Sequence, residues 1–453
     1  MNIRHALVPV YLSFCIILGG ASAAGMLANL MLQLAAVAIL LLTFALRPQS
    51  SLAGPTRGLM LLVIALVALF LVQLIPLPPE LWSSLPGRAP VVQGFEMLGQ
   101  PLPWLALSLA PINTLASLFW LLPAFAVLAA ILRYGGFRAD WIAWTIVIVT
   151  TVAVVLGAIQ VAGGARSPAY LYQITNPGFA VGFFSNANHM ATLLLVAIPF
   201  LAAIQKEALG KRRSIRHGSG LLVVTAMALL VILIGLLINR SLAGWGLAVP
   251  VMAASAVLLF RARKPIPRWI FPLVALLGFA AVAAVLSAPL GNNLTSEEAR
   301  MSAGSRFTSF SRTLDAAADY FPAGSGIGTF QDVYRTQEPP NDVDRIYMNH
   351  AHGDYFELYL ETGLAGAVLV ALFLLWWARR TWSLWSEPEP GAFARAATIA
   401  SAAILMHSIV DYPLRTAAIS AIFAACVALM AKPRSRSRAR RKTETSGRHL
   451  SAD

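Results

Sequence analysis

The chain has 453 residues, of which 58% are hydrophobic and only 12% are charged, and its formal net charge is +14. Soluble domains carry roughly 25% charged residues, so this composition excludes an ordinary soluble enzyme of about three domains. Apolar stretches of roughly 16 to 21 residues recur along the chain, each about long enough to cross a ~30 Å hydrocarbon layer as a helix. The sequence therefore predicts an all-α, polytopic integral membrane protein with one membrane domain over residues 1–431.

The positive charge and the cysteines indicate neither nucleic-acid binding nor a disulfide framework. Lys and Arg gather at the ends of apolar stretches, as in membrane proteins, and we expect no nucleic-acid partner. Cys15 and Cys426 lie inside apolar stretches without metal-ligand spacing. The opening "MNIRHALVPVYLSFCIILGGASAAG" resembles a signal peptide, but its apolar stretch is long and another follows at once, so we expect it to be retained as a span.

About twelve membrane-spanning helices are predicted. They cover residues 6–22, 26–46, 58–76, 112–132, 141–161, 189–204, 220–238, 242–260, 269–288, 362–378, 393–410 and 414–431. With the N-terminus in the cytoplasm, cytoplasmic segments hold 25 of the 34 Lys and Arg residues. Every cytoplasmic loop is then basic, as the positive-inside rule requires. Both termini are therefore expected in the cytoplasm.

Three long segments fall on the opposite, outer side: 77–111, 162–188 and 289–361. The last is the longest and joins the ninth span to the tenth. Most unusual polar residues lie in these segments or at outer span ends, whereas a transport path places ionisable groups near the bilayer midplane. Chemistry is therefore expected at the outer membrane surface. The basic tail, 432–453, is predicted to be disordered and to lie near anionic lipid headgroups.

The stretch "GFFSNANHMATLLL" marks the start of the sixth span. Asn186, Asn188 and His189 stand there, and either helix capping or substrate contact would account for them. Arg240, in "INRSLAGWG", falls in the tight outer hairpin between the seventh and eighth spans, against the charge bias. Its side chain could snorkel to headgroups, but its fork also matches phosphate oxygens, so we predict binding to a membrane-held anion.

A helix lying on the membrane surface is predicted within the longest outer loop. Phe307, Phe310, Leu314 and Ala317 recur there at helical spacing. Arg306 opens this helix, and an anion near a helix N-terminus beside an arginine is doubly favoured.

Three glycines, Gly324, Gly326 and Gly328, follow the predicted surface helix. A dinucleotide-binding loop would need a preceding strand and a βαβ unit, which the sequence lacks. The glycines therefore predict a turn that returns the chain to the membrane.

The stretch "YMNHAHGDYFELYLETGLAG" leads into the tenth span and contains His350, His352 and Asp354. A histidine at a membrane–water boundary can accept a proton from a hydroxyl, although interfacial hydrogen bonding remains an alternative. A His-x-His-x-Asp metal site is disfavoured, because no further pair has metal-ligand spacing. His407 and Asp411 lie one helical turn apart in "HSIVDYPL", where an ordinary helix contact is the alternative to a functional one.

Four stretches together resemble the O-antigen ligase and O-antigen polymerase superfamily of bacterial envelopes. They are "GFFSNANHMATLL", "RFTSFSRTLDAAADYFPAGSGIGTF", "HAHGDYFELYLETGLAG" and "HSIVDYPL", and the resemblance runs from about residue 140 to 425. It implies a helical enzyme of the bacterial inner membrane whose active site faces the periplasm. It also implies an undecaprenyl-diphosphate-linked oligosaccharide donor, a glycolipid or lipid-linked glycan acceptor, and inverting transfer without a metal or cofactor.

The resemblance also assigns roles to individual residues. His352 fits the histidine that ends the large outer loop, although Gly353 stands where asparagine is commoner. Arg306 fits the arginine of the surface helix, with Phe310 where tryptophan is frequent, and Arg240 fits the arginine of the outer hairpin. The two arginines would then stabilise charge on the leaving diphosphate, and the histidine would orient or deprotonate the acceptor hydroxyl.

Three functions stay open at this point. A ligase would transfer the glycan to lipid A–core, and a polymerase would join it to another lipid-linked repeat of O-antigen or exopolysaccharide. A transporter or flippase would carry out no covalent chemistry. The sequence favours an enzyme but does not separate ligase from polymerase, since both use one donor and one kind of site.

Overall fold

The computed structural model describes residues 3–23, 25–45, 54–133, 137–210, 215–260, 297–340, 348–387 and 391–432, together with 276 and 280. The predicted tail beyond residue 432, and nearly all of the predicted ninth span, lie outside the described residues.

The described residues are mostly helical, and the predicted apolar spans within them are helices. Eight segments are long and apolar enough to cross a membrane: α2 (Leu27–Ala45), α3 (Gly54–Gln73), α6 with α7 (Pro111–Trp120, Leu122–Arg133), α8 (Ala139–Ala162), α9 (Ala187–Gly210), α10 (Ile215–Asn239), α11 (Leu242–Phe260) and α15 (Asp354–Ser386). Three shorter apolar helices are α1 (Ile3–Leu18), α16 (Ala392–His407) and α17 (Ala417–Ala431). The chain is therefore a multi-pass membrane protein, and the count of twelve spans stays a prediction.

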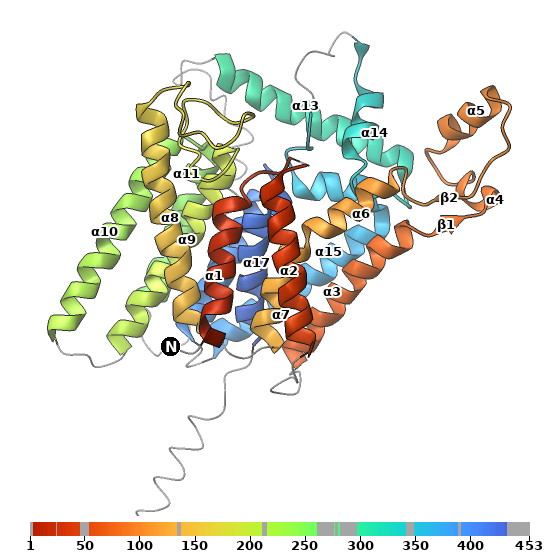
Figure 1. Ribbon diagram of the computed structural model, residues 1–453. Coiled ribbons are helices and arrows are strands. Elements are labelled where there is room, and N and C mark those ends of the chain that lie inside the picture. The colour runs from red at the N-terminus through yellow and green to blue at the C-terminus, as the bar shows by residue number, and fades with distance from the viewer. Residues whose placement is uncertain are drawn as a thin grey trace, which may run out of the picture.

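Helix α9 forms the centre of the bundle. Helices α8, α10, α11 and α16 all pack against it. Within its most apolar 18-residue stretch, 94% is buried inside the protein. Small residues let these helices approach closely: a Cβ atom on Gly244 of α11 would lie 2.7 Å from that of Ala191 of α9. Helix α17, rich in alanine, packs against α1, α7 and α16 beside this centre (Figure 1).

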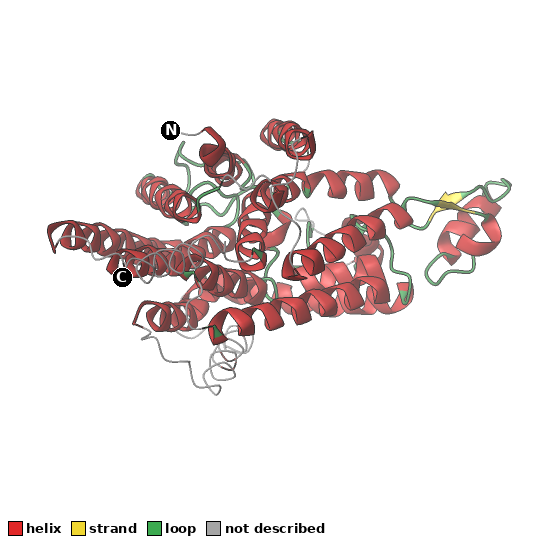
Figure 2. Cartoon of the chain, turned by 90° about the horizontal axis from the view of Figure 1, so that it is seen from below, coloured by secondary structure: helices red, strands yellow, loops and turns green. Residues whose placement is uncertain are grey.

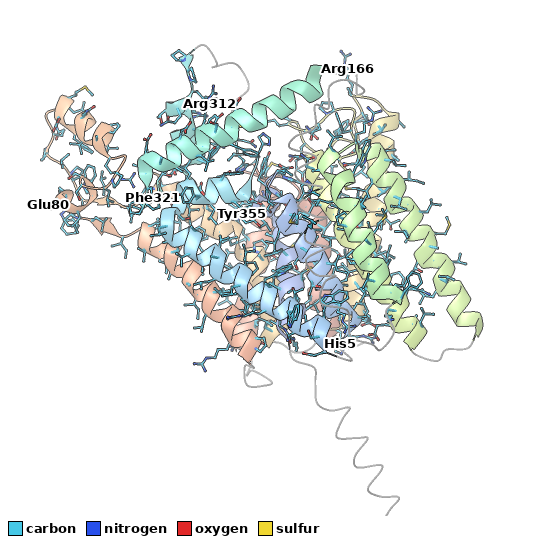
Figure 3. All side chains as sticks on the ribbon, turned by 180° about the vertical axis from the view of Figure 1, so that it is seen from behind. His5, Glu80, Arg166, Arg312, Phe321 and Tyr355 are labelled. Atoms are coloured by element: carbon cyan, nitrogen blue, oxygen red, sulfur yellow. The ribbon has the colours of Figure 1, made fainter. Side chains whose placement is uncertain are left out.

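The bundle has two distinct ends. Thr56, where α3 begins, donates a hydrogen bond to the carbonyl of Ala431, where α17 ends, so two predicted cytoplasmic segments meet. His5 lies at that end in Figure 3, whereas Arg166 and Arg312, from two predicted outer segments, lie at the other. The chain thus alternates between the two ends as the charge pattern requires.

Helix α13 (Glu297–Tyr320) lies across the end that gathers the predicted outer segments (Figure 1), followed by α14 (Phe330–Gln337). It packs on α15, with the rings of Phe310 and Phe356 4.6 Å apart. The prediction that Arg306 opens this helix is wrong, because the helix begins nine residues earlier, at Glu297. A helix N-terminus therefore does not favour an anion at Arg306.

The glycine-rich segment forms the predicted turn, and it sits on a kink in α15. Gly324, Gly326 and Gly328 all have positive φ, and the kink residue Gly363 has φ 55° and ψ −138°. A Cβ atom on Gly324 would lie 2.6 Å from the carbonyl oxygen of Glu361, so glycine is required for this contact. The Gly326 amide donates to the same oxygen at 2.9 Å. The turn thereby fixes the first part of α15.

A small subdomain between α3 and α6 adds a pair of two-residue strands to the helical fold. It contains β1 (Pro76–Leu77), α4 (Pro79–Trp82), α5 (Ala89–Met97) and β2 (Leu105–Ala106), with the two strands antiparallel. We call residues 74–110 the arm. Figures 1 and 2 show that the arm projects sideways from the end of the bundle.

Candidate active site

A tight turn just before α15 carries the predicted catalytic histidine. His352 has φ 55°, in the left-handed region that non-glycine residues rarely adopt, at a cost on the order of 1–3 kcal/mol. The amide of Asp354 holds the turn, because it donates to the carbonyls of Ser408 at 3.0 Å and Asp411 at 3.3 Å. The side chain of His352 remains 25% exposed. The fold thus fixes the backbone of His352 while leaving its ring accessible.

The carboxylate of Asp411 lies between two imidazoles. Its Oδ1 atom is 4.0 Å from Nδ1 of His352 and 4.0 Å from Nε2 of the buried His189. The same oxygen accepts a hydrogen bond from the amide of Tyr412 at 2.9 Å, which orients the carboxylate. A carboxylate in this position stabilises positive charge on a neighbouring imidazole.

His407 and Asp411 are joined through the backbone and contact different neighbours. Helix α16 ends at His407, and the Asp411 amide donates to the His407 carbonyl at 3.0 Å. Nδ1 of His407 lies 2.8 Å from the hydroxyl of Thr192 on α9. His407 therefore ties the end of α16 to α9, whereas Asp411 lies beside His352.

The ring of Tyr412 is the common neighbour of three histidines. Its centroid is 5.0 Å from that of His189, 4.5 Å from His350 and 5.5 Å from His352. Burial, with the charge of Asp411 acting in the same direction, raises the pKa of the Tyr412 hydroxyl well above its usual value. Tyr412 is therefore an uncharged, buried ring against which the histidines pack.

Glu357 holds the segment that precedes His352. Its carboxylate accepts from Nδ1 of His350 at 3.0 Å and from the amide of Ala351 at 3.1 Å. Glu357 lies one turn into α15, on the same helix that the turn enters. Two hydrogen bonds from consecutive residues to one carboxylate fix the path of the chain into the turn.

Arg415 binds three carboxylates of α15. Its guanidinium lies 3.8 Å from Asp354, 3.4 Å from Glu357 and 3.1 Å from Glu361, and all three acids share one helix face by their i, i+3, i+7 spacing. Burial lowers the pKa of Arg415, but the charges of Glu357, Glu361 and Asp354 outweigh it and raise that pKa overall. Arg415 thus locks the start of α15 to the segment between α16 and α17.

The first turn of α9 approaches the same cluster. Asn186 caps the helix, because its Oδ1 accepts from the amide of Asn188 at 2.8 Å. Its side chain also hydrogen-bonds to Tyr412. Oδ1 of Asn188 accepts from the hydroxyl of Ser241 at 2.7 Å. The capping interpretation is therefore confirmed for Asn186, and His189 enters the cluster from the next position.

Arg240 sits in the hairpin between α10 and α11 with φ 58°. Its neighbours hold the hairpin: Asn239 donates to the carbonyls of Ala180 and Ala187, and Ser241 donates to Asn188. The side chain of Arg240 is exposed. The hairpin thus presents an arginine from a fixed backbone beside the start of α9.

The structure adds residues that the sequence interpretation missed. They are Glu357, Glu361, Tyr412 and Arg415. The Asp-x-x-Glu-x-x-x-Glu spacing in "DYFELYLE" was a readable signal for a shared helix face, but nothing in the sequence paired that face with Arg415. Arg306 lies in the interior of α13, and its side chain is outside the described residues.

The assembled cluster suits proton transfer beside a membrane surface. It brings together an accessible imidazole, a carboxylate behind it, and a rigid support on three helices. These are the elements of a general base whose protonated form is stabilised by a nearby carboxylate.

Comparison with known proteins shows a similarity to one family over part of the chain. No curated protein matches it. Residues 226–371 match the model of a family described as O-antigen ligase. The matched segment contains Arg240, His352 and Glu357, whereas Asp411 and Arg415 lie beyond it and reach the cluster only through the fold. The match confirms the resemblance predicted from the motifs: over these residues the chain is similar to the O-antigen ligase family.

Proposed function

We propose that the protein is an inverting glycosyltransferase that moves a glycan from an undecaprenyl-diphosphate donor to lipid A–core. It works without a metal or a cofactor, at the periplasmic face of the bacterial inner membrane, with both termini in the cytoplasm. The family match supports the class of enzyme, and the basic bias of the opposite loops supports the orientation.

The observation that carries this proposal is the His352–Asp411 pair. Nδ1 of His352 lies 4.0 Å from the carboxylate, while part of the ring remains exposed. His352 takes the proton of the acceptor hydroxyl as the new glycosidic bond forms. Asp411 stabilises the resulting imidazolium. General-base catalysis of this kind is typically worth ~10²–10⁴-fold in rate.

The leaving diphosphate needs positive charge at the membrane surface. Arg240 supports this role, because it is exposed on a hairpin fixed beside α9. Arg306 is proposed as the second phosphate ligand on the strength of the family resemblance. Arginine forks match phosphate oxygens, and in a partly dehydrated site they stabilise developing charge more strongly than in water.

The test is transfer by the purified protein. A lipid-diphosphate oligosaccharide is offered with lipid A–core or with a second lipid-linked repeat, and the glycosidic products are separated by mass. Product on lipid A–core supports the ligase, and product only on the second repeat replaces the ligase with the polymerase. No product with either acceptor, together with passage of the donor across a vesicle membrane, would favour the transporter.

A further inference from the structure

The arm exposes large apolar side chains and almost no charge. Met97 is 83% exposed, Leu98 is 73% exposed and Trp104 is 66% exposed. Among the charged residues of the arm, Arg88 is buried, while Glu80 and Glu96 are exposed. Figure 3 marks Glu80 on this projecting unit. Several large apolar side chains exposed on one small unit indicate an interaction site.

We call Met97 and Leu98 the tip of the arm. These residues are exposed although the arm has a buried interior of its own. Trp82 is almost completely buried within the arm, and its indole N–H donates to the carbonyl of Pro103 at 2.8 Å. The guanidinium of Arg88 donates to the carbonyls of Leu107 and Gly324, which ties the arm to the turn on α15. The arm is therefore an ordered unit with a defined attachment to the bundle. The exposure of its tip is a property of this ordered unit.

The arm is connected at both ends to helices that can span a membrane, which indicates lipid as the partner of its tip. The arm leaves the end of α3 and returns at the start of α6, and both helices are candidate membrane spans. Only 17% of the most apolar 18-residue stretch of α3 is buried inside the protein. Exposed apolar residues lie on both sides of the junction between span and arm: Leu71 and Val72 on α3, and Ile75 and Leu81 on the arm. The lipid-facing surface of the span thus continues onto the arm.

We propose that the arm docks on the lipid surface at the end of the bundle that carries the candidate site, with Met97 and Leu98 inserted between the lipids. The exposed Trp104 suits a membrane–water interface, because one edge of an indole is apolar and the other can remain hydrated. The exposed charges are both acidic, so anionic headgroups do not provide the attraction. Docking therefore rests on apolar contact and is insensitive to salt.

The test uses a fluorescent reporter at the tip. Cys15 and Cys426 are fully buried, so a Met97→Cys variant offers one reactive thiol for an environment-sensitive nitrobenzoxadiazole label. The control is Glu338→Cys, a partly exposed position at the C-terminal cap of α14. Both labelled proteins are placed in nanodiscs of phosphatidylethanolamine and phosphatidylglycerol. We expect a blue-shifted emission at position 97 that nitroxide lipids quench and aqueous iodide does not, at low salt and in 1 M NaCl alike.

Two further outcomes decide the proposal. Adding Leu98→Asp to the labelled Met97→Cys protein should lower quenching by nitroxide lipids and raise quenching by iodide, because a carboxylate disfavours insertion. Equal iodide quenching at positions 97 and 338 would overturn lipid docking. Efficient bismaleimide cross-linking between two Met97→Cys chains, without quenching by nitroxide lipids, would overturn it in favour of a second copy of this protein.

Discussion

The imidazole of His352 and the carboxylate of Asp411 face each other at 4.0 Å, although the first residue precedes α15 and the second follows α16. The pair is brought together by the Asp354 amide, which donates to the Ser408 and Asp411 carbonyls. The strained backbone of His352 is thereby held beside a carboxylate that can stabilise positive charge on its ring. This arrangement leads to the first prediction.

Replacing His352 should abolish transfer without preventing folding. We expect His352→Gly to reduce the transfer rate by ~10²-fold or more, because the base is lost. Glycine accepts φ 55°, so this change removes the ring while relieving backbone strain. Protein yield and donor binding should match the wild type. His350→Ala should be milder, and a His352→Gly variant with wild-type transfer would show that another group is the base.

At Arg240, as at His352, glycine can replace the residue without backbone strain, since φ is 58°. Both Arg240→Ala and Arg240→Gly should lower transfer by roughly 10²-fold, because an electrostatic contact to the leaving diphosphate is lost. Arg240→Lys should recover only part, as an ammonium cannot bind phosphate bidentately. Initial rates at varied donor concentration measure the effect. Full activity of the glycine variant would remove Arg240 from the site.

Arg415 should be a major contributor to stability. Arg415→Met leaves the buried carboxylates of Asp354, Glu357 and Glu361 without their partly buried cation, and breaking a buried ion pair typically costs about 3–5 kcal/mol. The thermal unfolding midpoint in detergent should fall markedly, as followed by size-exclusion chromatography. The control is Arg379→Met on the exposed side of α15, where little change is expected. An unaltered midpoint for Arg415→Met would contradict the structural role.

Two substitutions of Tyr412 distinguish the contribution of its ring packing from that of its hydroxyl hydrogen bonds. Tyr412→Phe keeps the ring contacts with the histidines and loses the hydroxyl, a change of about 1 kcal/mol or a few-fold in rate. Tyr412→Leu also removes the aromatic surface and should be the more damaging change. The measurement is kcat/KM for both variants. Equal activity of the phenylalanine and leucine variants would exclude a role for the ring.

Orientation in the membrane can be tested by thiol labelling in spheroplasts. The partly exposed Glu338 and the exposed Leu209 lie on segments predicted to face opposite sides. An impermeant maleimide should label Glu338→Cys in intact spheroplasts and Leu209→Cys only after lysis. The reverse pattern would invert the proposed topology.

The sequence by itself determined the helical class and the apolar helices of the described residues, and it indicated the region in which the site is proposed. Apolar runs of spanning length fold as helices because backbone groups must pair internally in lipid, so length and hydropathy suffice. The positive-inside rule needs only charge counts, and the local motifs around Asn186, Arg240 and His352 needed no tertiary information.

Only the tertiary structure decided which distant residues meet. The pairing of Arg415 with Glu357, of Tyr412 with three histidines, and of Asp411 with His352 depends on helix packing that no local pattern encodes. The start of α13 was misplaced for a related reason, since its apolar face begins well after its first turn. The arm escaped prediction because its strands are two residues long, and such strands form only where the fold brings their backbones together.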